Sequence, residues 1–522
     1  MAKENEQSKE LATKLWAIAD DLRSNMDATM FKNYILGVIF YRYLSERTER
    51  YMDDLLKNDG ISYEKAMASQ AYEKTVRKWS IEQLGYVIEP KYLFKNLVAE
   101  IPEKKFSVEH LEKAVKSLTA STVGQESEPA FSGLFDAMDL QSTALGKEVS
   151  DRTDRMAKVM SRISTIDFDI DDADILGNAY MILIGLFQSA AGKKGGEFFT
   201  AAGPATCLAR IAAHGLKSVK SACDPCAGSG SLLLRVQAEL SDHEVGHFYA
   251  DELEPVTYNL LRMNMLMHGV PYRKFSTYNM DSIEGKIDGH EVFDGKLFTI
   301  QVANPPYSHK YSADASLLDD TRFSSAGVLP PKGYEDMMFL ESMVAHMADD
   351  GRVAALFPHG ILFRGGAEGQ IRKYLIDNLN VIDAVIGLPA NLFHGTTIPV
   401  CIVVCKKDRN GDSGNILFID ASKHFKKGKS QNELEDSDID RIVNAYVERK
   451  DIEKFAHVAK ISEIVKNEYN LNISRYVDIS EEEEELDPNE LAATLLQDKN
   501  DIQEAKDKLK PMIAELGLKW PF

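Results

Sequence analysis

The residues with the clearest chemical use directly follow an apolar run over residues 298–303. They are Asn304, Pro305, Pro306 and Tyr307. Two consecutive prolines stiffen the backbone and remove two N–H donors. The side-chain oxygen of Asn304 and the carbonyl oxygen of Pro305 can therefore both accept from one planar amino group, which aims its nitrogen lone pair at an electrophile. Tyr307 adds a flat face for stacking, so the motif predicts a site that acts on an amino group.

A glycine-containing turn, Asp224-Pro-Cys-Ala-Gly-Ser-Gly-Ser231, is the second candidate site. Gly228 and Gly230 let the backbone turn tightly and approach a ligand, and the helix predicted to follow offers free N–H groups. The turn lacks the third glycine of the dinucleotide fingerprint and the Gly-Lys-Ser/Thr of a phosphate loop. It predicts a nucleotide-type site, and a purely structural turn is the alternative.

Acidic residues follow the next two predicted strands. Glu252 stands about 20 residues after the glycine turn, where α/β nucleotide folds place an acid on the ribose hydroxyls, and Asp251 is the neighbouring alternative. Asp281 stands at the end of the following strand. Its carboxylate can accept from an adenine amino group, or it can merely cap a turn.

The cysteines do not indicate metal or disulfide chemistry. Cys223 and Cys226 form a Cys-x-x-Cys pair, but a zinc or redox site needs a second pair nearby or a thioredoxin context. Cys207 is distant in sequence, and Cys401 and Cys405 lie in an apolar run, where cysteine packs well. We therefore expect no metal, and five cysteines in 522 residues suit a reducing cytoplasm.

Two kinds of pattern divide most of the chain into regions that position these residues. Residues 1–170 are predicted to be helical, because apolar side chains recur at helical spacing. Residues 171–425 alternate short apolar runs with helical patterns, which is typical of βαβ units and a mostly parallel, doubly wound sheet. Strands are predicted at 217–223, 245–250, 273–278, 297–303, 352–357, 381–387, 399–405 and 415–420, with helices between many of them, such as 230–240, 254–268, 336–348 and 367–379.

Residues 426–522 are charged and are predicted to be helical. The acidic run Glu481–Glu485 predicts a solvated linker. Pro488 then begins a final helix, and its apolar residues predict a face that docks on this chain or on another. These residues are Leu491, Leu495, Ile502, Leu509 and Ile513.

The charge balance restricts how the chain can bind nucleic acid. Lys and Arg number 61 and Asp and Glu number 81, which gives a net charge of −20. A protein that grips DNA alone usually has a basic excess. Either nucleic acid is not the substrate, or a partner supplies phosphate contacts, or basic residues are clustered locally. No apolar stretch is long enough for a membrane-spanning helix, and the first residues lack the apolar core of a signal peptide.

The motifs together resemble amino-methyltransferases that use S-adenosylmethionine, and more narrowly the methylation subunit of type I restriction–modification systems. Ala201 departs from that family, which usually has proline there. The resemblance covers nearly the whole chain and is carried by Asn25–Gly37, Tyr43–Glu46, Gly196–Thr200, Asp224–Ser231, Tyr258–Asn264, Asn304–Tyr307, Phe357–Arg364, Leu388–Thr396 and Tyr469–Val477.

This resemblance implies a Rossmann-like α/β methyltransferase domain over residues 171–425. An all-helical domain for partner or DNA contact, residues 1–170, precedes it, and a helical tail for partner docking, residues 426–522, follows it. The implied catalytic residues are Asn304, Pro305, Pro306, Tyr307 and Phe393. S-adenosylmethionine is implied to be bound by Glu197, Phe198, Phe199, Thr200, Ala201, Ala202, Asp224, Gly228, Ser229, Gly230, Ser231, Glu252 and Asp281.

The resemblance also implies methyl transfer to N6 of an adenine that is flipped out of duplex DNA. Tyr307 and Phe393 would stack on the two faces of the base, although Phe393 can also be a core aromatic. A separate specificity subunit would read the DNA sequence with two methylation subunits, and a restriction subunit would join them. Residues 308–332 would form a long loop that covers the DNA, orders on binding or is simply mobile.

Two other functions remain open from the sequence alone. A glutamine-N5 or RNA methyltransferase can use the same Asn-Pro-Pro-Tyr motif, although it would pair it with a small recognition domain rather than about 170 helical residues. A cofactor-binding assembly subunit without activity would be expected to carry a degraded motif, yet residues 304–307 are intact.

Overall fold

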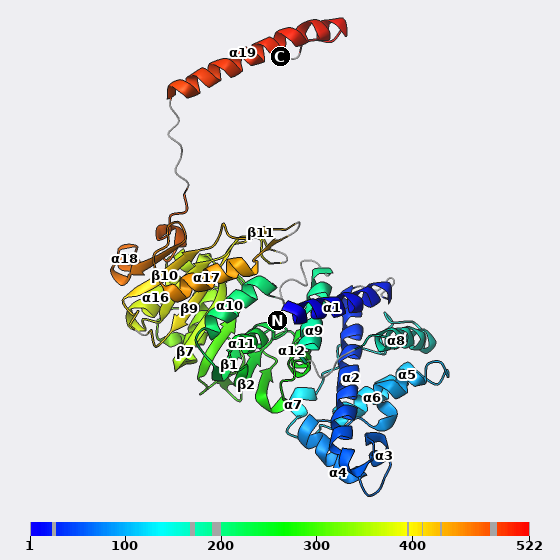
Figure 1. The fold of residues 1–522 in the computed structure, drawn as a ribbon. Helices are drawn as coiled ribbons and strands as arrows, with labels where there is room; N and C mark the ends of the chain where they lie inside the picture. The colour runs from blue at the N-terminus through cyan, green and yellow to red at the C-terminus, as the bar shows by residue number, and fades with distance from the viewer. Residues whose placement is uncertain are drawn as a thin grey trace. The chain divides into compact units, whose positions relative to one another are not determined.

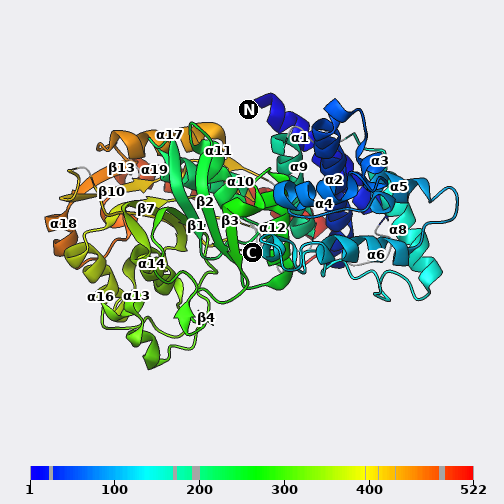
Figure 2. The ribbon, with the colours of Figure 1, turned by 90° about the horizontal axis from the view of Figure 1, so that it is seen from below.

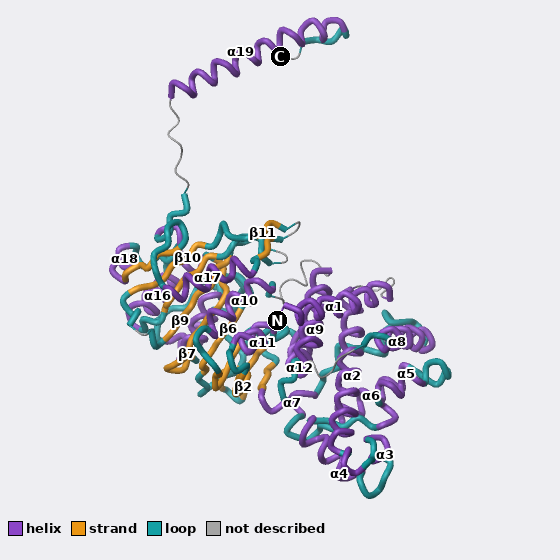
Figure 3. Tube along the Cα trace, in the orientation of Figure 1, coloured by secondary structure: helices purple, strands orange, loops and turns teal. Residues whose placement is uncertain are grey.

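A computed structural model describes residues 2–22, 28–167, 173–190, 200–393, 396–409, 411–428, 431–480 and 488–520. The chain divides into two compact units, Met1–Val477 and Asp478–Phe522. In the first unit a helical region precedes an α/β region (Figures 1 and 3). The predicted boundaries near residues 170 and 425 both fall inside this unit.

The N-terminal region is helical, as its periodicity predicts. Helix α2, Ala28–Leu55, buries Phe31, Ile35 and Phe40, which lie on more than one face of the helix. The side-chain oxygen of Ser107 accepts from the N–H of His110 and so caps α6. The other helices of this region are α1 Ala2–Leu22, α3 Tyr63–Met67, α4 Glu73–Trp79, α5 Phe94–Ala99, α6 Val108–Ala120, α7 Glu128–Phe131, α8 Val149–Ser164 and α9 Ala173–Ala190.

The core of the α/β region is, within the described residues, a nine-stranded sheet of order β13-β10-β8-β9-β7-β6-β1-β2-β3. Strand β9 is antiparallel to β7 and β8, β13 is antiparallel to β10, and the other neighbours pair in parallel. All eight predicted strands are confirmed. The strands are β1 Ser218–Asp224, β2 Glu244–Asp251, β3 Phe275–Tyr278, β6 Phe298–Ala303, β7 Met347–Pro358, β8 Ile382–Gly387, β9 Val400–Lys406, β10 Asn415–Asp420 and β13 Ala456–Lys460.

Helices cover both faces of this sheet, which is the predicted doubly wound architecture. Figure 2 shows α11 and α17 on one side of the strands and α14 and α16 on the other. Two short antiparallel pairs lie outside the main sheet, β4 Lys286–Ile287 with β5 His290–Glu291 and β11 Lys426–Lys427 with β12 Asn432–Glu433. The helices are α10 Ala202–Ala213, α11 Ser231–Glu239, α12 Pro255–Met267, α13 Thr321–Ser324, α14 Asp336–Ala345, α15 Gly360–Phe363, α16 Ala367–Lys373, α17 Asp436–Glu448 and α18 Ile461–Lys466.

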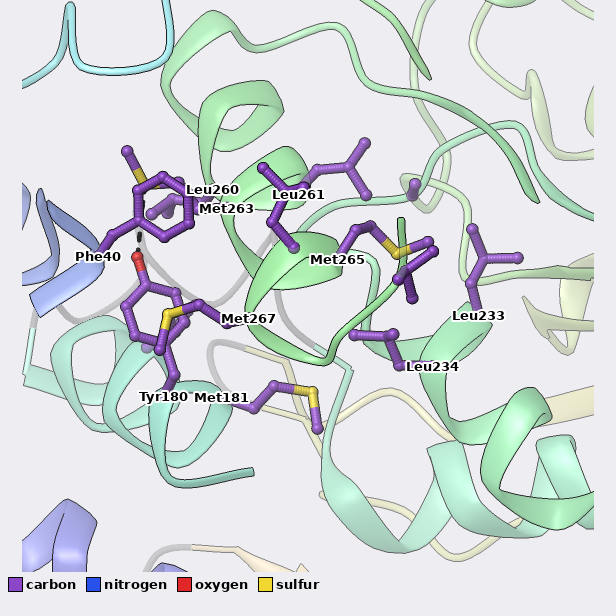
Figure 4. Close-up of a cluster of buried hydrophobic side chains, with 14 of the residues drawn as sticks. Phe40, Tyr180, Met181, Leu233, Leu234, Leu260, Leu261, Met263, Met265 and Met267 are labelled. Carbon is purple, nitrogen blue, oxygen red and sulfur yellow. Dashed lines mark hydrogen bonds between the residues drawn. The ribbon is translucent and has the colours of Figure 1, made fainter. Parts of the chain in front are cut away.

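Helix α12 joins the helical region to the sheet region. The hydroxyl of Tyr43 on α2 donates to the carbonyl oxygen of Leu266 at 2.9 Å. The hydroxyl of Tyr180 on α9 donates to Sδ of Met263 at 3.4 Å. Figure 4 shows the apolar cluster in which Phe40 and Tyr180 meet the methionines of α12. The two regions therefore share one hydrophobic core.

Two segments differ from what the sequence pattern predicts. Strand β13 was not predicted, because it lies in the charged stretch after residue 425, yet it extends the sheet as an edge strand. The long stretch 308–332 is partly folded, since it contains α13 and its buried Arg322 donates to the carbonyl oxygens of Ser282 and Ile283 at 2.8 Å each. A role for this stretch over DNA stays a prediction.

The second unit contains the long helix α19, Pro488–Glu515, which begins where the sequence predicts. None of its described residues is buried. Leu495 and Ile502 are more than half exposed, at 61% and 57%. The acidic run 481–485 lies outside the described residues.

Candidate functional site

The candidate residues meet where the strand order of the sheet reverses. Strand β1 pairs in parallel with both β2 and β6, and the chain extends the sheet from β1 in one direction and from β6 in the other. The carboxyl ends of β1 and β6 therefore lie side by side at a switch point, where open α/β sheets bind ligands. The glycine turn follows β1, and Asn304 follows β6.

Asn304 is held through both atoms of its side-chain amide. Nδ2 donates to Oγ1 of Thr200 at 3.1 Å, and Oδ1 accepts from the hydroxyl of Tyr307 at 2.6 Å. Thr200 is buried and lies just before α10. The contact brings the end of the predicted cofactor loop to the predicted catalytic motif. Between Asn304 and Tyr307, Pro305 is buried and Pro306 is exposed.

The ring of Tyr307 meets Phe393 edge to face. Their ring centroids lie 6.3 Å apart, and their planes make an angle of 89°. Phe393 is buried in the segment that follows β8. A base between two stacking rings needs nearly parallel ring planes, so the predicted sandwich requires one ring to rotate. Burial raises the pKa of Tyr307, so its hydroxyl stays protonated and donates to Asn304.

The glycine turn has the conformation that its residues predict. Gly228 and Gly230 have φ angles of 55° and 77°, in the left-handed region that glycine adopts without strain. A Cβ atom on Gly230 would lie 2.6 Å from Cδ1 of Leu261. Buried Asn264 on α12 donates from Nδ2 to the carbonyl oxygen of Ser229 at 2.8 Å. Asn264 was not predicted to belong to the site, although a polar residue within an apolar helix was the available signal.

Of the two acids at the end of β2, Glu252 faces the glycine turn. Its carboxylate accepts from the N–H groups of Gly228 and Glu254, both at 2.9 Å. Asp251 is fully buried and accepts from a backbone N–H after β3 at 3.2 Å. Asp281 accepts from the N–H groups two and three residues later at 2.8 and 2.9 Å. In this structure Asp281 therefore caps a turn, the alternative that the sequence left open.

Four buried polar atoms around the turn have no hydrogen-bond partner among the described residues: Oδ2 of Asp224, Oγ of Ser229, Oδ2 of Asp251 and Oδ1 of Asn264. Leaving such an atom unpaired costs about 1–3 kcal/mol. Burial raises the pKa of Asp224 to about 7 and that of Asp251 to about 8, and it also raises the pKa of Glu252. These oxygens can accept from hydroxyl and amino donors, and the free N–H groups at the start of α11 can donate to an acceptor. The set fits a ligand that carries both kinds of group, such as S-adenosylmethionine.

The remaining predicted cofactor residues divide into two groups. Ala201 and Ala202 lie where α10 begins, and buried Ser231 begins α11. Glu197, Phe198 and Phe199 lie outside the described residues.

The cysteines are all unpaired thiols, and burial raises the pKa of each. Over the described ranges, no three His, Cys, Asp or Glu side chains are grouped so that they could hold a metal ion. The same ranges contain no helix that is long and apolar enough to span a membrane.

Comparison with known proteins places the chain in a family. The family model described as N-6 DNA Methylase matches residues 171–485, and the model described as HsdM N-terminal domain matches residues 11–163. The chain is 34% identical to the type I restriction enzyme MpnII methylase subunit of Mycoplasma pneumoniae, over 98% of this chain and 97% of that protein. It is 26% identical to the MjaIX methylase subunit of Methanocaldococcus jannaschii, over 97% and 92% of the two chains.

A solved structure agrees with these sequence matches. The methyltransferase subunit of a type I restriction–modification system from Streptococcus thermophilus superposes with a TM-score of 0.83 at 37% identity. The match covers 90% of this chain and 100% of that chain. The chain is thus a member of the N-6 DNA methylase family, an adenine-specific DNA methyltransferase of the kind that forms the methylation subunit of type I restriction enzymes.

Proposed function

We propose that the chain methylates N6 of an adenine that has been flipped out of duplex DNA, with S-adenosylmethionine as cofactor. The observation that carries the proposal is the contact between Asn304 and Thr200 at the switch point. It joins an acceptor for an amino group to Thr200, at the end of the predicted cofactor loop. A planar amine bound at Asn304 would therefore lie beside the cofactor.

The roles of the residues follow from their atoms. When bound, S-adenosylmethionine supplies an activated methyl group on its sulfonium. Asp224 and Ser229 hold the cofactor through their unpaired oxygens, and Glu252 accepts from its ribose hydroxyls. Oδ1 of Asn304 and the carbonyl oxygen of Pro305 accept from the two N6 hydrogens and orient the nitrogen lone pair. No general base is needed, because the proton leaves after the transfer.

Access to the site requires base flipping. A base inside a duplex cannot reach the switch point, so the adenine has to leave the stack. The rings of Tyr307 and Phe393 offer stacking that is worth about 1–3 kcal/mol for each ring. The target amine and the Tyr307 hydroxyl both need Oδ1 of Asn304. An amide oxygen has two lone pairs, so the base and the hydroxyl would share it.

Choice of the DNA site is assigned to a partner. A chain with a net charge of −20 is poorly suited to grip DNA alone. We assign the reading of the DNA sequence to a specificity subunit that joins two methylation subunits. We assign DNA cleavage to a restriction subunit. The complex would work in the cytoplasm. The N-terminal helices and the exposed apolar face of α19 are the docking elements.

The test is a methylome. The chain is expressed with its specificity subunit in a host that lacks DNA methylation, and N6-methyladenine is located by long-read sequencing. We expect one two-part motif methylated on both strands. Asn304→Ala should abolish it while the dissociation constant of S-adenosylmethionine changes little, and Asn58→Ala, an exposed asparagine far along the chain from the site, is the control.

The two possible negative results of these experiments have different meanings. A wild-type complex that is assembled but leaves no methylated motif would reject DNA as substrate. Loss of both methylation and cofactor binding in Asn304→Ala, measured by calorimetry, would mean a misfolded loop rather than a lost acceptor.

A further inference from the structure

We propose that Asp336 and Arg364 are positioning residues for methyl transfer, because they hold the catalytic loop through the backbone of Ser308. This inference rests on the proposed function and deepens it. Neither residue belongs to the predicted site, and the sequence motif that ends in Arg364 had no role assigned. Asp336 begins α14, and Arg364 directly follows α15.

Ser308, directly after Tyr307, has a φ angle of 51°. This left-handed conformation is uncommon for residues other than glycine. The backbone N–H of Ser308 donates to Oδ1 of Asp336 at 3.0 Å. The next residue is fixed to the same helix start, because Nδ1 of His309 lies 2.7 Å from Oε2 of Glu335 and the N–H of Glu335 donates to the carbonyl oxygen of His309 at 3.2 Å. Residues 308 and 309 are thus tied to the start of α14 by three contacts.

Arg364 is the cation that accompanies this buried carboxylate. Its NH1 atom lies 3.5 Å from Oδ2 of Asp336 and 2.9 Å from Oε1 of Glu368. Its Cζ atom lies 3.9 Å from the ring centroid of Tyr334, which fixes the guanidinium plane. Asp336 is fully buried. Burial raises the pKa of Asp336, whereas the N–H of Ser308 and Arg364 lower it. Arg364 therefore favours the charged form, which is the stronger acceptor.

Asp336 acts on the site through the peptide unit that joins Tyr307 to Ser308. A strained residue persists only where its surroundings hold it. Without the carboxylate of Asp336, Ser308 is free to relax toward a more common conformation. Tyr307 then shifts relative to Asn304. A misplacement of about 1 Å can lower a reaction rate about 100-fold.

The experiment measures single-turnover methylation by the complex of this chain with its specificity subunit, on a duplex that carries the motif found by the methylome. We expect Asp336→Ala to lower the rate constant about 10- to 100-fold, with the dissociation constant of S-adenosylmethionine unchanged. Asp336→Asn keeps an acceptor at Oδ1 and should lower the rate constant less than Asp336→Ala does. Glu341→Gln is the matched control, because Glu341 is also a buried acid on α14 and its Oε2 has no hydrogen-bond partner in the described part of the chain.

A rescue separates positioning from folding. Glycine adopts a positive φ without strain, so adding Ser308→Gly to Asp336→Ala should restore part of the lost rate. A general folding defect would not respond in this way, since glycine makes the unfolded chain more flexible. Equal rates for Asp336→Ala and Glu341→Gln, or a loss that Ser308→Gly does not reduce, would overturn the inference. A wild-type complex without activity would reject the proposed function instead.

Discussion

At the scale of single residues, one oxygen atom is shared by two donors. Oδ1 of Asn304 accepts from the Tyr307 hydroxyl in this structure, and it has to accept from the target amine during transfer. We expect Tyr307→Phe to lower the apparent KM for DNA, because the ring remains and the target amine no longer shares Oδ1 with a hydroxyl. A net hydrogen bond is worth about 0.5–1.5 kcal/mol, so the change should be about 2- to 12-fold.

Tyr307→Ala is the matched variant, and it removes the ring together with the hydroxyl. It should raise KM, because base stacking is lost. Steady-state kinetics of the complex on a duplex substrate measure both variants. If Tyr307→Phe is as impaired as Tyr307→Ala, the hydroxyl itself takes part in the transfer.

The buried carboxyl of Asp224 predicts a pH dependence of cofactor binding. Its pKa is about 7 because it is buried. A cationic ligand prefers the carboxylate form, so affinity should rise as the pH increases through the pKa of the free protein. Between pH 6 and pH 8 the ionised fraction rises from about one tenth to nine tenths. We therefore expect about a tenfold gain in affinity by calorimetry, and a flat profile for Asp224→Asn. A slope that persists in Asp224→Asn would assign the titration to another acid.

Residue types and spacing predicted Asn304, Tyr307 and Glu252, because each stands at the end of a strand whose apolar run is visible in the sequence. Asp336 was not predicted as part of the site. Its link to the loop depends on the left-handed turn at Ser308, and a single sequence does not reveal the fold that brings the two together.

At the scale of elements, the glycine turn depends on its own packing against α12. Gly230→Ala would place a methyl group 2.6 Å from Leu261 and would strain a positive φ. Gly124→Ala is the matched control, because Gly124 has a similar φ of 73° and a Cβ atom added there would meet no atom within 4 Å. We expect Gly124→Ala to lower the free energy of unfolding by about 1–2 kcal/mol.

Gly230→Ala should lower the free energy of unfolding by about 1–3 kcal/mol more than Gly124→Ala does, because its methyl group overpacks the contact with Leu261. Denaturant unfolding of the two variants gives the difference. Equal losses would mean that α12 moves aside and that the turn tolerates a side chain.

Strands β6, β8 and β10 could be predicted because they are buried on both faces over most of their length and are mostly apolar. β13 could not. It is a short edge strand that carries His457 and Lys460 and needs only one buried face. Its strand conformation is fixed by pairing with β10, a contact that no local pattern shows.

At the scale of the whole molecule, the chain has one unit with a core and one without. α19 contributes no described residue to a buried core. Ending the chain after Val477 should therefore change the melting temperature by less than about 2 °C, and cofactor binding should remain. Methylation in the complex should be lost, because α19 is the proposed docking element. Thermal unfolding and the methylome test the two statements separately.

A point change tests the apolar face of α19 without truncation. Leu495→Glu places a charge on that face, and Asn500→Glu places one on the opposite face of the same helix. Only Leu495→Glu should weaken assembly in size-exclusion chromatography. Equal behaviour of the two variants would mean that another surface binds the partner.

The shared core of α2 and α12 also sets the order in which the chain matures on the ribosome. Tyr43 and its acceptor at Leu266 are separated by 223 positions. At a synthesis rate of about 5–20 residues per second, α12 is translated roughly 10 to 45 s after α2. During that interval the apolar residues of α2 that pack on α12 lack their final cover, and transiently exposed surface of this kind favours aggregation unless a chaperone covers it. The N-terminal helices are thus the first part to be synthesised. They reach their final packing only when Glu252 and α12 have left the exit tunnel of the ribosome.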